Sequence, residues 1–340
     1  MTAVDSVDDD ELRAANCWFP KTDRVPGRPD LTAFKQQARL RQARWGEGQG
    51  YRAGGHPGRN GEPVKNGSKL RPDGPRDEDF RNFLDSADIR NAVRHRSAPE
   101  TMRTEPGQQF KEDRLRYDLL SSMPMCFNLF GELHEDSERL TNVGKKLFGV
   151  EEAGLCVKFE HSPRRQSLDF TNDGTAFDVA LFFGSDDGPR TVVGIETKYH
   201  EHAVREAAPD TLTARRPAIP ENRLKMPRYR EIAERARDEG VFKPGWEKVV
   251  LGTSLQQIWR DHLLLLAMLQ YQDGARWHAG KYVLVHPVRN PSFAEAGEAY
   301  LLDVLADDQT FAVMTIEDLV RPGVLHSPEV ASGFESRYLW

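Results

Sequence analysis

Two apolar stretches separated by a short turn-like segment constrain the fold of this chain most. They are AFDVALFF (176–183) and TVVGIETKY (191–199), and GSDDGP lies between them. Their length and their β-branched and aromatic content indicate two buried strands, and the Gly, Asp and Pro of the connection are typical of a hairpin. Three ionisable residues, Asp178, Glu196 and Lys198, nevertheless lie within these strands. A fold that buries both strands must balance their charges.

Further strands and a helix are predicted around this pair. GLCVKFEH (154–161) alternates apolar and polar residues, and KYVLVHP (281–287) and TFAVMTIEDLV (310–320) each contain a strand-like run. Ser254 and Gln257, at capping-box spacing, open a helix that is apolar on nearly all sides. We expect the first three strands to pair as an antiparallel meander and the fourth to return by a helical crossover. The expected fold class is α/β, with a mixed central sheet flanked by helices.

The domain organisation follows from changes in composition. Residues 112–290 are expected to form a core that contains an insertion at 203–253, and residues 291–340 to complete the same domain with a strand and a helix. Residues 1–111 are expected to be a basic, loop-rich and partly flexible N-terminal extension. Its segment 35–71 has nine basic residues against two acidic ones, although the whole chain has a net charge of −6. Two interpretations of this segment stay open: an arm that contacts phosphates and bases, or a solvated linker.

Cysteine usage and hydropathy indicate the compartment. The three cysteines are odd in number and far apart, which suits neither a disulfide framework nor a zinc cluster. The longest apolar run, LLLLAML, is too short to span a bilayer, and the acidic N-terminal residues lack the apolar region of a signal peptide. We therefore expect a cytoplasmic protein without a membrane partner.

The three ionisable residues point to metal-assisted hydrolysis of a phosphodiester. Residues two apart share one face of a strand, so Glu196 and Lys198 project together, and a regular hairpin places Asp178 beside Glu196. Two close carboxylates repel each other unless a cation relieves them, and ligation by oxygen alone suits Mg²⁺ or Mn²⁺ better than zinc. Such a cation neutralises the phosphodiester, and a lysine beside it can orient or activate the attacking water. The alternative is a surface ion pair between Glu196 and Lys198 with a solvated Asp178.

The order of elements and the E-x-K motif together resemble the PD-(D/E)XK nuclease superfamily. The phrases SSMPMCFNLFG, GTAFDVALFF, GIETKYHE and QQIWRDHLLL resemble its bacterial restriction-endonuclease-like branch. The resemblance implies a restriction-endonuclease-like core of helix, three strands, helix and strand. It also implies that Asp178 and Glu196 bind the metal and that Lys198 is catalytic, with the backbone carbonyl of Thr197 as a further ligand. Phe177 stands where the name of the motif has Pro, at a position that touches no metal.

Four more polar residues are candidates for supporting roles. Members of the superfamily often add an acid from the first helix, for which Glu132 is the candidate, and a glutamine from the helix after the E-x-K strand, for which Gln257 is the candidate. Glu160 and Glu201 are candidates for outer ligands. Each has a simpler interpretation: a solvated carboxylate for Glu132, a helix cap for Gln257, and strand-end charges for Glu160 and Glu201.

The function expected is that of a Mg²⁺- or Mn²⁺-dependent DNA endonuclease of the restriction or defence type. Phosphate contacts are expected from Arg39, Arg41, Arg44, Arg52, Arg215, Arg216 and Arg223. Two alternatives stay open: a catalytically silent nucleic-acid-binding or regulatory module on the same fold, and a nuclease acting on RNA or single strands. The oligomeric state is open as well, between a homodimer and a complex with a defence-system partner.

Overall fold

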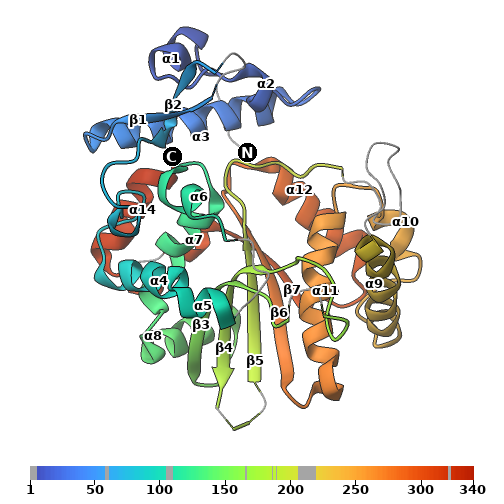
Figure 1. The fold of residues 1–340 in the computed structure, drawn as a ribbon. Helices are drawn as coiled ribbons and strands as arrows, with labels where there is room; N and C mark the ends of the chain where they lie inside the picture. Colours follow the sequence, from blue (N-terminus) through green and yellow to red (C-terminus); the bar gives the residue numbers. More distant parts are fainter. Residues whose placement is uncertain are drawn as a thin grey trace.

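Figure 1 shows the fold in a computed structural model of the chain. The structure describes residues 6–57, 61–104, 110–164, 167–185, 187–188, 190–205, 220–320 and 323–340.

A mixed sheet of five strands lies at the centre of the fold, in the order β3-β4-β5-β6-β7 (Figure 1). The strands β3, β4 and β5 pair antiparallel, and β6 and β7 run parallel to β5. The mixed sheet flanked by helices that the sequence predicted is therefore confirmed. The strands are β3 (Gly154–His161), β4 (Phe177–Gly184), β5 (Arg190–Thr197), β6 (Trp277–His286) and β7 (Phe311–Thr315).

Helices on the two sides of the sheet enclose two apolar cores. In β4 and β5, residues such as Val179 and Ile195 point into one core. Residues such as Ala180 and Val192 point into the other. This division follows from the period of two in a strand, which sends successive side chains to opposite faces. In the described parts of the chain, no helix is long and apolar enough to span a bilayer.

The helices that accompany each core are grouped in Figure 1. Those on the side of the first core are α4 (Ala87–Ser97), α5 (Pro99–Thr104), α6 (Glu112–Tyr117), α7 (Ser122–Phe130), α8 (Ser137–Val143), α13 (Ile316–Leu319) and α14 (Pro328–Tyr338). Those on the side of the second core are α9 (Pro220–Asp238), α10 (Trp246–Val250), α11 (Gln256–Gln270) and α12 (Pro291–Ala299). Short helical turns occupy η1 (Arg76–Glu78), η2 (Gly131–Leu133), η3 (Gly144–Phe148), η4 (Tyr271–Gly274) and η5 (Tyr300–Val304).

The helix that follows the insertion starts later than its sequence predicts. α11 begins at Gln256, and its N-cap residue Leu255 makes no side-chain cap. The predicted capping box of Ser254 and Gln257 is therefore wrong. Instead Gln256 Oε1 accepts a hydrogen bond from the backbone N–H of Gly252 at 2.8 Å. The side chain of Gln257 is thus not needed to cap the helix.

An N-terminal unit lies across one end of the sheet (Figure 1). Where the sequence predicted a flexible basic segment, the structure has a 20-residue helix followed by a two-stranded hairpin. The composition misled because basic residues of the helix pair with acidic residues outside the basic segment, as Arg39 does with Asp23. The unit comprises α1 (Asp9–Ala14), α2 (Pro20–Asp23), α3 (Pro29–Gly48), β1 (Ala53–Pro57) and β2 (Pro63–Leu70).

Candidate active site

Strands β4 and β5 place two carboxylates opposite each other. Val179 pairs with Ile195, so Asp178 and Glu196 occupy the next opposing positions in the antiparallel register. The hairpin that joins the strands lies at their other end, so both acids lie at the end of the sheet that faces the N-terminal unit (Figure 1). Glu196 is buried and Asp178 is half-buried. The two acids therefore meet at a sheltered edge of the sheet.

One oxygen of Asp178 is held by the neighbouring strand. Its Oδ2 accepts hydrogen bonds from the backbone N–H of Thr197 at 2.8 Å and from the Thr197 hydroxyl at 2.7 Å. Within the part of the chain that the structure describes, no donor reaches the second oxygen, Oδ1. Two donors fix the orientation of the carboxylate and leave Oδ1 for a ligand.

The lysine of the E-x-K motif forms a buried ion pair with its glutamate. Lys198 Nζ lies 2.5 Å from Glu196 Oε1, and only 10% and 11% of the two side chains are exposed. Gln257 Nε2 lies 3.5 Å from the same oxygen. This burial is unlike the solvated surface pair that the sequence left open. Gln257, by contrast, reaches the site from α11.

Burial and the neighbouring charges shift the pKa values of all three groups. Burial, together with the charge of Glu196, raises the pKa of Asp178 to about 7, against the opposing effects of Lys198 and Thr197. Burial likewise raises the pKa of Glu196 to about 7, against the opposing effect of Lys198. For Lys198, burial lowers the pKa, but the charges of Glu196, Asp261 and Asp178 together leave it raised. The single ammonium of Lys198 thus does not compensate both buried carboxylates, whose pKa values stay raised. The ammonium itself remains protonated at neutral pH.

A fourth ionisable residue, Asp261, belongs to this cluster and was missed from the sequence. It lies on α11, four residues after Gln257, and is 4% exposed. Residues at this spacing share one face of a helix, so Asp261 lies on the side of α11 that reaches Glu196. Burial raises its pKa to about 7. The available signal was a single acid in an apolar helix, one turn after a candidate glutamine.

The other two acids near the strand ends have different surroundings. Glu160 of β3 lies across from Asp178, since Phe159 pairs with Val179 and His161 pairs with Phe177. Its backbone has a φ of 50°, which is unusual for a residue other than glycine. The charge of Glu160 helps to raise the pKa of Glu196.

The side chain of Glu201 is held by a nearby backbone N–H and an arginine. Its Oε2 accepts a hydrogen bond from the N–H of Tyr199 at 2.9 Å, and its Oε1 lies 3.9 Å from Arg114 Nη2. Burial raises the pKa of Glu201, but the charges of His200 and Lys198 outweigh it and leave the pKa lowered. Glu201 therefore stays ionised and connects strand β5 with helix α6.

Glu132 does not join the cluster. Its Oε2 accepts from the N–H of Ser327 at 2.7 Å, and its Oε1 accepts from the hydroxyls of Ser327 at 2.9 Å and Ser86 at 3.3 Å. Ser86 and Ser327 are the N-cap residues of α4 and α14. The carboxylate thus links the starts of two helices, which is a structural task.

The aromatic residue before Asp178 has a packing reason. A Cβ on Gly194 would lie 2.6 Å from the ring of Phe177, so this ring covers the backbone of β5 where no side chain intervenes. The same ring stacks on Tyr282 with 6.3 Å between centroids. Phe177 therefore belongs to the core beneath the site.

Three arginines expected to bind phosphates are occupied by the protein itself. Buried Arg39 donates to both oxygens of Asp23 at 2.7 Å and to Ser68 at 3.0 Å. Arg41 donates to backbone carbonyls at the end of α14, and Arg44 forms an ion pair with Glu11. The structure therefore contradicts the phosphate-binding role predicted for Arg39, because its guanidinium is buried and paired.

The remaining predicted phosphate contacts are not tested by these bonds. Arg52 is exposed. Arg215 and Arg216 lie outside the described residues, and so does the side chain of Arg223.

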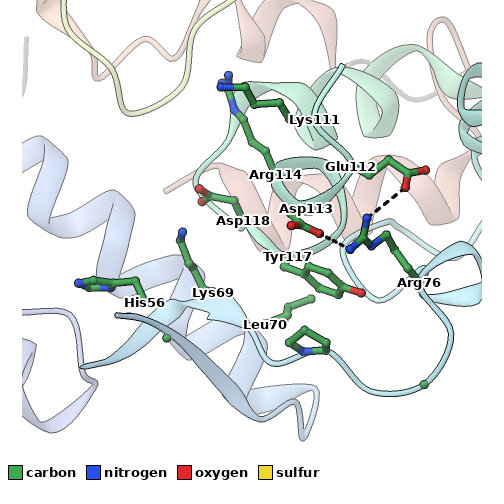
Figure 2. A pocket seen from close by; sticks show the side chains of 13 residues that line it. His56, Lys69, Leu70, Arg76, Lys111, Glu112, Asp113, Arg114, Tyr117 and Asp118 are labelled. Atoms are coloured by element: carbon green, nitrogen blue, oxygen red, sulfur yellow. Dashed lines mark ion pairs between the residues drawn. The ribbon is translucent and has the colours of Figure 1, made fainter. Parts of the chain in front are cut away.

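A groove with a volume of about 960 Å³ between the β1–β2 hairpin and α6 presents other basic side chains (Figure 2). Lys69 of β2 faces Lys111 and Arg114 at the start of α6. A fourth cation in the groove, Arg76, is paired with Glu112 at 3.6 Å and with Asp113 at 3.1 Å.

This groove approaches the acidic cluster. Arg114 lines the groove, and its guanidinium also lies 3.9 Å from Glu201, three residues after Lys198. Asp118 faces the groove too, and its Oδ1 accepts from the N–H of Leu120 at 3.2 Å. Two lysines and an arginine thus form a basic surface beside the ends of the central strands.

The donor atoms at the strand ends suit a hard cation. They are carboxylate and carbonyl oxygens from Asp178, Glu196 and Thr197, the type that Mg²⁺ and Mn²⁺ prefer. Among the described residues, no group of three or more His, Cys, Asp or Glu side chains is arranged to hold a metal. A cation held here would therefore complete its shell with water and substrate oxygens, as Mg²⁺ commonly does. Three raised carboxyl pKa values in one buried cluster agree with such a cation.

Comparisons with known proteins give one match. Residues 29–340 match the family described as the PD-(D/E)XK nuclease superfamily, so the match extends from α3 to the last described residue. No curated protein and no solved structure matches the chain.

Proposed function

Because the chain belongs to the PD-(D/E)XK nuclease superfamily, we propose that it is a Mg²⁺- or Mn²⁺-dependent DNA endonuclease of the restriction or defence type. The observation that carries this proposal is the buried cluster of Asp178, Glu196 and Lys198 at the ends of β4 and β5. Burying these charges is costly unless a ligand of opposite charge completes the site. A divalent cation and a phosphate together supply that ligand.

Each residue of the cluster has a separate task in this proposal. Asp178, Glu196 and the carbonyl of Thr197 would hold the cation, which supplies charge neutralisation at the phosphate and a bound water of lowered pKa. Thr197 fixes the orientation of Asp178 through its N–H and hydroxyl. The two carboxylates thus keep a defined geometry before any ligand arrives.

Lys198 acts as a charged donor. The neighbouring carboxylates raise its pKa, so the ammonium stays protonated at neutral pH. It therefore cannot serve as a general base, which must be unprotonated to accept a proton. Its role is to hydrogen-bond the attacking water or the developing negative charge on the phosphate. The Lys198 Nζ also lies over the ring of Phe293, 5.7 Å from the ring centroid.

The groove of Figure 2 would hold the phosphate backbone of the substrate. Lys69, Lys111 and Arg114 line it, and Arg114 connects it to Glu201, three residues after Lys198. Phosphate contacts of this kind position a nucleic acid without reading its sequence. The basic surface used is thus the groove, while the arginines of α3 support the fold.

The test is a cleavage assay on supercoiled plasmid, linear duplex, single-stranded DNA and RNA, each with Mg²⁺, Mn²⁺ or EDTA. We expect metal-dependent cleavage of duplex DNA. Lys198→Ala should reduce the rate by about a thousandfold or more, because a preorganised charged donor is lost. Lys281→Ala, on β6 and outside the cluster, is the matched control and should retain activity.

The same proteins separate catalysis from binding. Lys198→Ala should bind duplex DNA nearly as well as the wild type. The double variant Lys69→Gln/Lys111→Gln should bind about tenfold more weakly and with a smaller salt dependence. Cleavage by Lys198→Ala at the wild-type rate would refute the role of Lys198. Failure of the wild type to cut any substrate would favour the catalytically silent binding module. Cleavage of RNA or single strands alone would show that these, and not duplex DNA, are the substrate.

A further inference from the structure

Within the described residues, the helix that reaches Glu196 carries an unpaired carboxylate oxygen, on Asp261. Asp261 is 4% exposed, and its Oδ2 is buried without a hydrogen-bond partner among the described residues. Leaving a buried charged oxygen without a donor costs several kcal/mol in order of magnitude. Packing does not explain why an aspartate stands at this position, because a leucine would fill the same space on the apolar helix. The aspartate therefore calls for another explanation.

The position of Asp261 indicates which group would relieve it. Gln257, one helical turn earlier, reaches Glu196 Oε1 at 3.5 Å. The charge of Asp261 acts on Lys198 more strongly than that of Asp178 does, and only Glu196 has a larger effect. Two carboxylates therefore act on the charge of Lys198: Glu196, two residues before it, and Asp261 on α11.

The ion pair seen here competes with the site's proposed ligand. Lys198 Nζ lies 2.5 Å from Glu196 Oε1, on the carboxylate that the proposed function assigns to a divalent cation. An ammonium and a cation repel each other at that distance, so Lys198 must move when the cation binds. Its flexible side chain has three N–H donors and needs another acceptor nearby.

We propose that Asp261 is this second acceptor: when a divalent cation takes the oxygens of Glu196, the Lys198 ammonium turns from Glu196 to Asp261 Oδ2. This inference rests on the proposed function. Asp261 is then a positioning residue that holds Lys198 toward the substrate and does not bind the cation. That role agrees with the described residues, in which three acids do not converge on one metal position.

Counted over Asp178, Glu196, Asp261 and Lys198, the charges also balance under this arrangement. Asp178, Glu196 and Asp261 carry three negative charges when ionised, and Lys198 carries one positive charge. Two negative charges remain, and one divalent cation neutralises them. Without Asp261 the loaded cluster would carry an excess positive charge in a buried setting, with Lys198 lacking an acceptor.

The experiment compares the full chain with its Asp261→Asn variant in the absence of nucleic acid. Mg²⁺ affinity is measured by calorimetry, the Lys198 ammonium is followed by NMR after ¹⁵N-lysine labelling, and thermal unfolding is recorded without Mg²⁺. We expect Mg²⁺ to shift the Lys198 signal in the wild type only. We also expect Asp261→Asn to bind Mg²⁺ about tenfold more weakly or worse, without a lower unfolding temperature. Asp261→Ser is the second variant, because it also removes the charge and adds no volume.

Asp79→Asn is the matched control for a buried aspartate. Both oxygens of Asp79 contact Arg81, at 2.8 and 2.5 Å, so this variant should lose stability and keep its Mg²⁺ affinity. A Lys198 signal that responds to Mg²⁺ equally in the wild type and in Asp261→Asn would overturn the inference and leave the proposed function standing. A wild type that binds no Mg²⁺ would overturn both.

Discussion

The molecule has two buried clusters of charge, and they differ in how their charges are satisfied. In the N-terminal unit, Arg39 donates to both oxygens of Asp23 and to the hydroxyl of Ser68. At the ends of β4 and β5, the Lys198 ammonium contacts Glu196, and Asp261 Oδ2 has no partner in the described structure. The first cluster is complete within the protein, whereas the second is short of positive charge.

This difference distinguishes buried charged residues that stabilise the fold from buried charged residues that belong to the candidate site. A buried charge with all its partners in place fixes the packing of the elements that carry it. A buried charge without a partner is destabilising unless a ligand supplies one. Arg337 belongs to the first kind, since its guanidinium donates to Gln42 at 3.0 Å and to Asn82 at 2.6 and 2.8 Å. Paired arginines therefore indicate the scaffold, and unpaired carboxylates indicate the site.

The largest effect is expected from breaking the complete cluster. Arg39→Met leaves Asp23 buried and unpaired, so the free energy of unfolding should fall by about 3–5 kcal/mol. Urea denaturation measures this loss. Arg44→Met is the control, because its pair with Glu11 is exposed and should contribute less than about 1 kcal/mol. Equal losses in the two variants would remove the distinction between the clusters.

The incomplete cluster should respond to pH through its ligand. The pKa values of Asp178 and Glu196 are about 7, so protons compete with a divalent cation for both groups below neutral pH. Mg²⁺ affinity should rise by about tenfold to a hundredfold between about pH 6 and about pH 8, with protons released on binding. Calorimetry in buffers of different ionisation enthalpy counts these protons. An affinity independent of pH would show that the carboxyls do not take up protons in the free protein.

Removing a carboxylate from the incomplete cluster should stabilise the protein when no cation is present. The folded pKa of Asp178, about 7, exceeds the ordinary value of 3.8, so the folded state binds the extra proton. The stability linked to this proton is fully present below about pH 4 and is lost as the pH rises through about 7. Asp178→Asn should therefore raise the unfolding free energy by about 1–2 kcal/mol at alkaline pH in EDTA and change it little in acid. A lower melting temperature at both pH values would contradict this sign.

The smallest effect is expected from two adjacent glutamines, of which Gln257 contacts the site and Gln256 supports the fold. Gln257 makes a long 3.5 Å contact with Glu196, so Gln257→Ala should slow cleavage by less than about tenfold and leave stability unchanged. Gln256 accepts from Gly252 at 2.8 Å and is buried, so Gln256→Ala should cost about 1 kcal/mol of stability and leave the rate unchanged. Rate and melting measurements on both variants test the assignment. The opposite pattern would place Gln256 at the site.

The sequence was informative where structure depends on local pattern. Strands such as Gly154–His161 could be predicted because their apolar residues alternate or form a short continuous run, and the period of two already placed Glu196 and Lys198 on one face. The sequence was misleading where contacts between distant residues decide the outcome. Arg39 resembles a solvated basic residue until Asp23 is seen beside it.

Two further residues show the same limit. Glu132 resembles a metal ligand until the N–H of Ser327, far along the chain, is seen to occupy it. Asp261 could not be assigned, because a pattern within one helix does not reveal the side on which that helix meets a sheet. Local spacing predicts which residues share a face, and the packing of elements decides what that face meets.

Tyr199, the neighbour of Lys198, is supported from both ends of the described chain. Gln42 of α3 donates to its hydroxyl at 2.9 Å, and the rings of Tyr338 and Trp340 pack edge-on against it at 5.4 and 6.4 Å. During synthesis, α3 leaves the ribosome long before residues 338–340 do. A nascent chain thus carries the acidic strands before the strand end is braced, and contacts of such long sequence separation form slowly. All the contacts that brace Tyr199 are therefore in place only after the last of these residues has been translated.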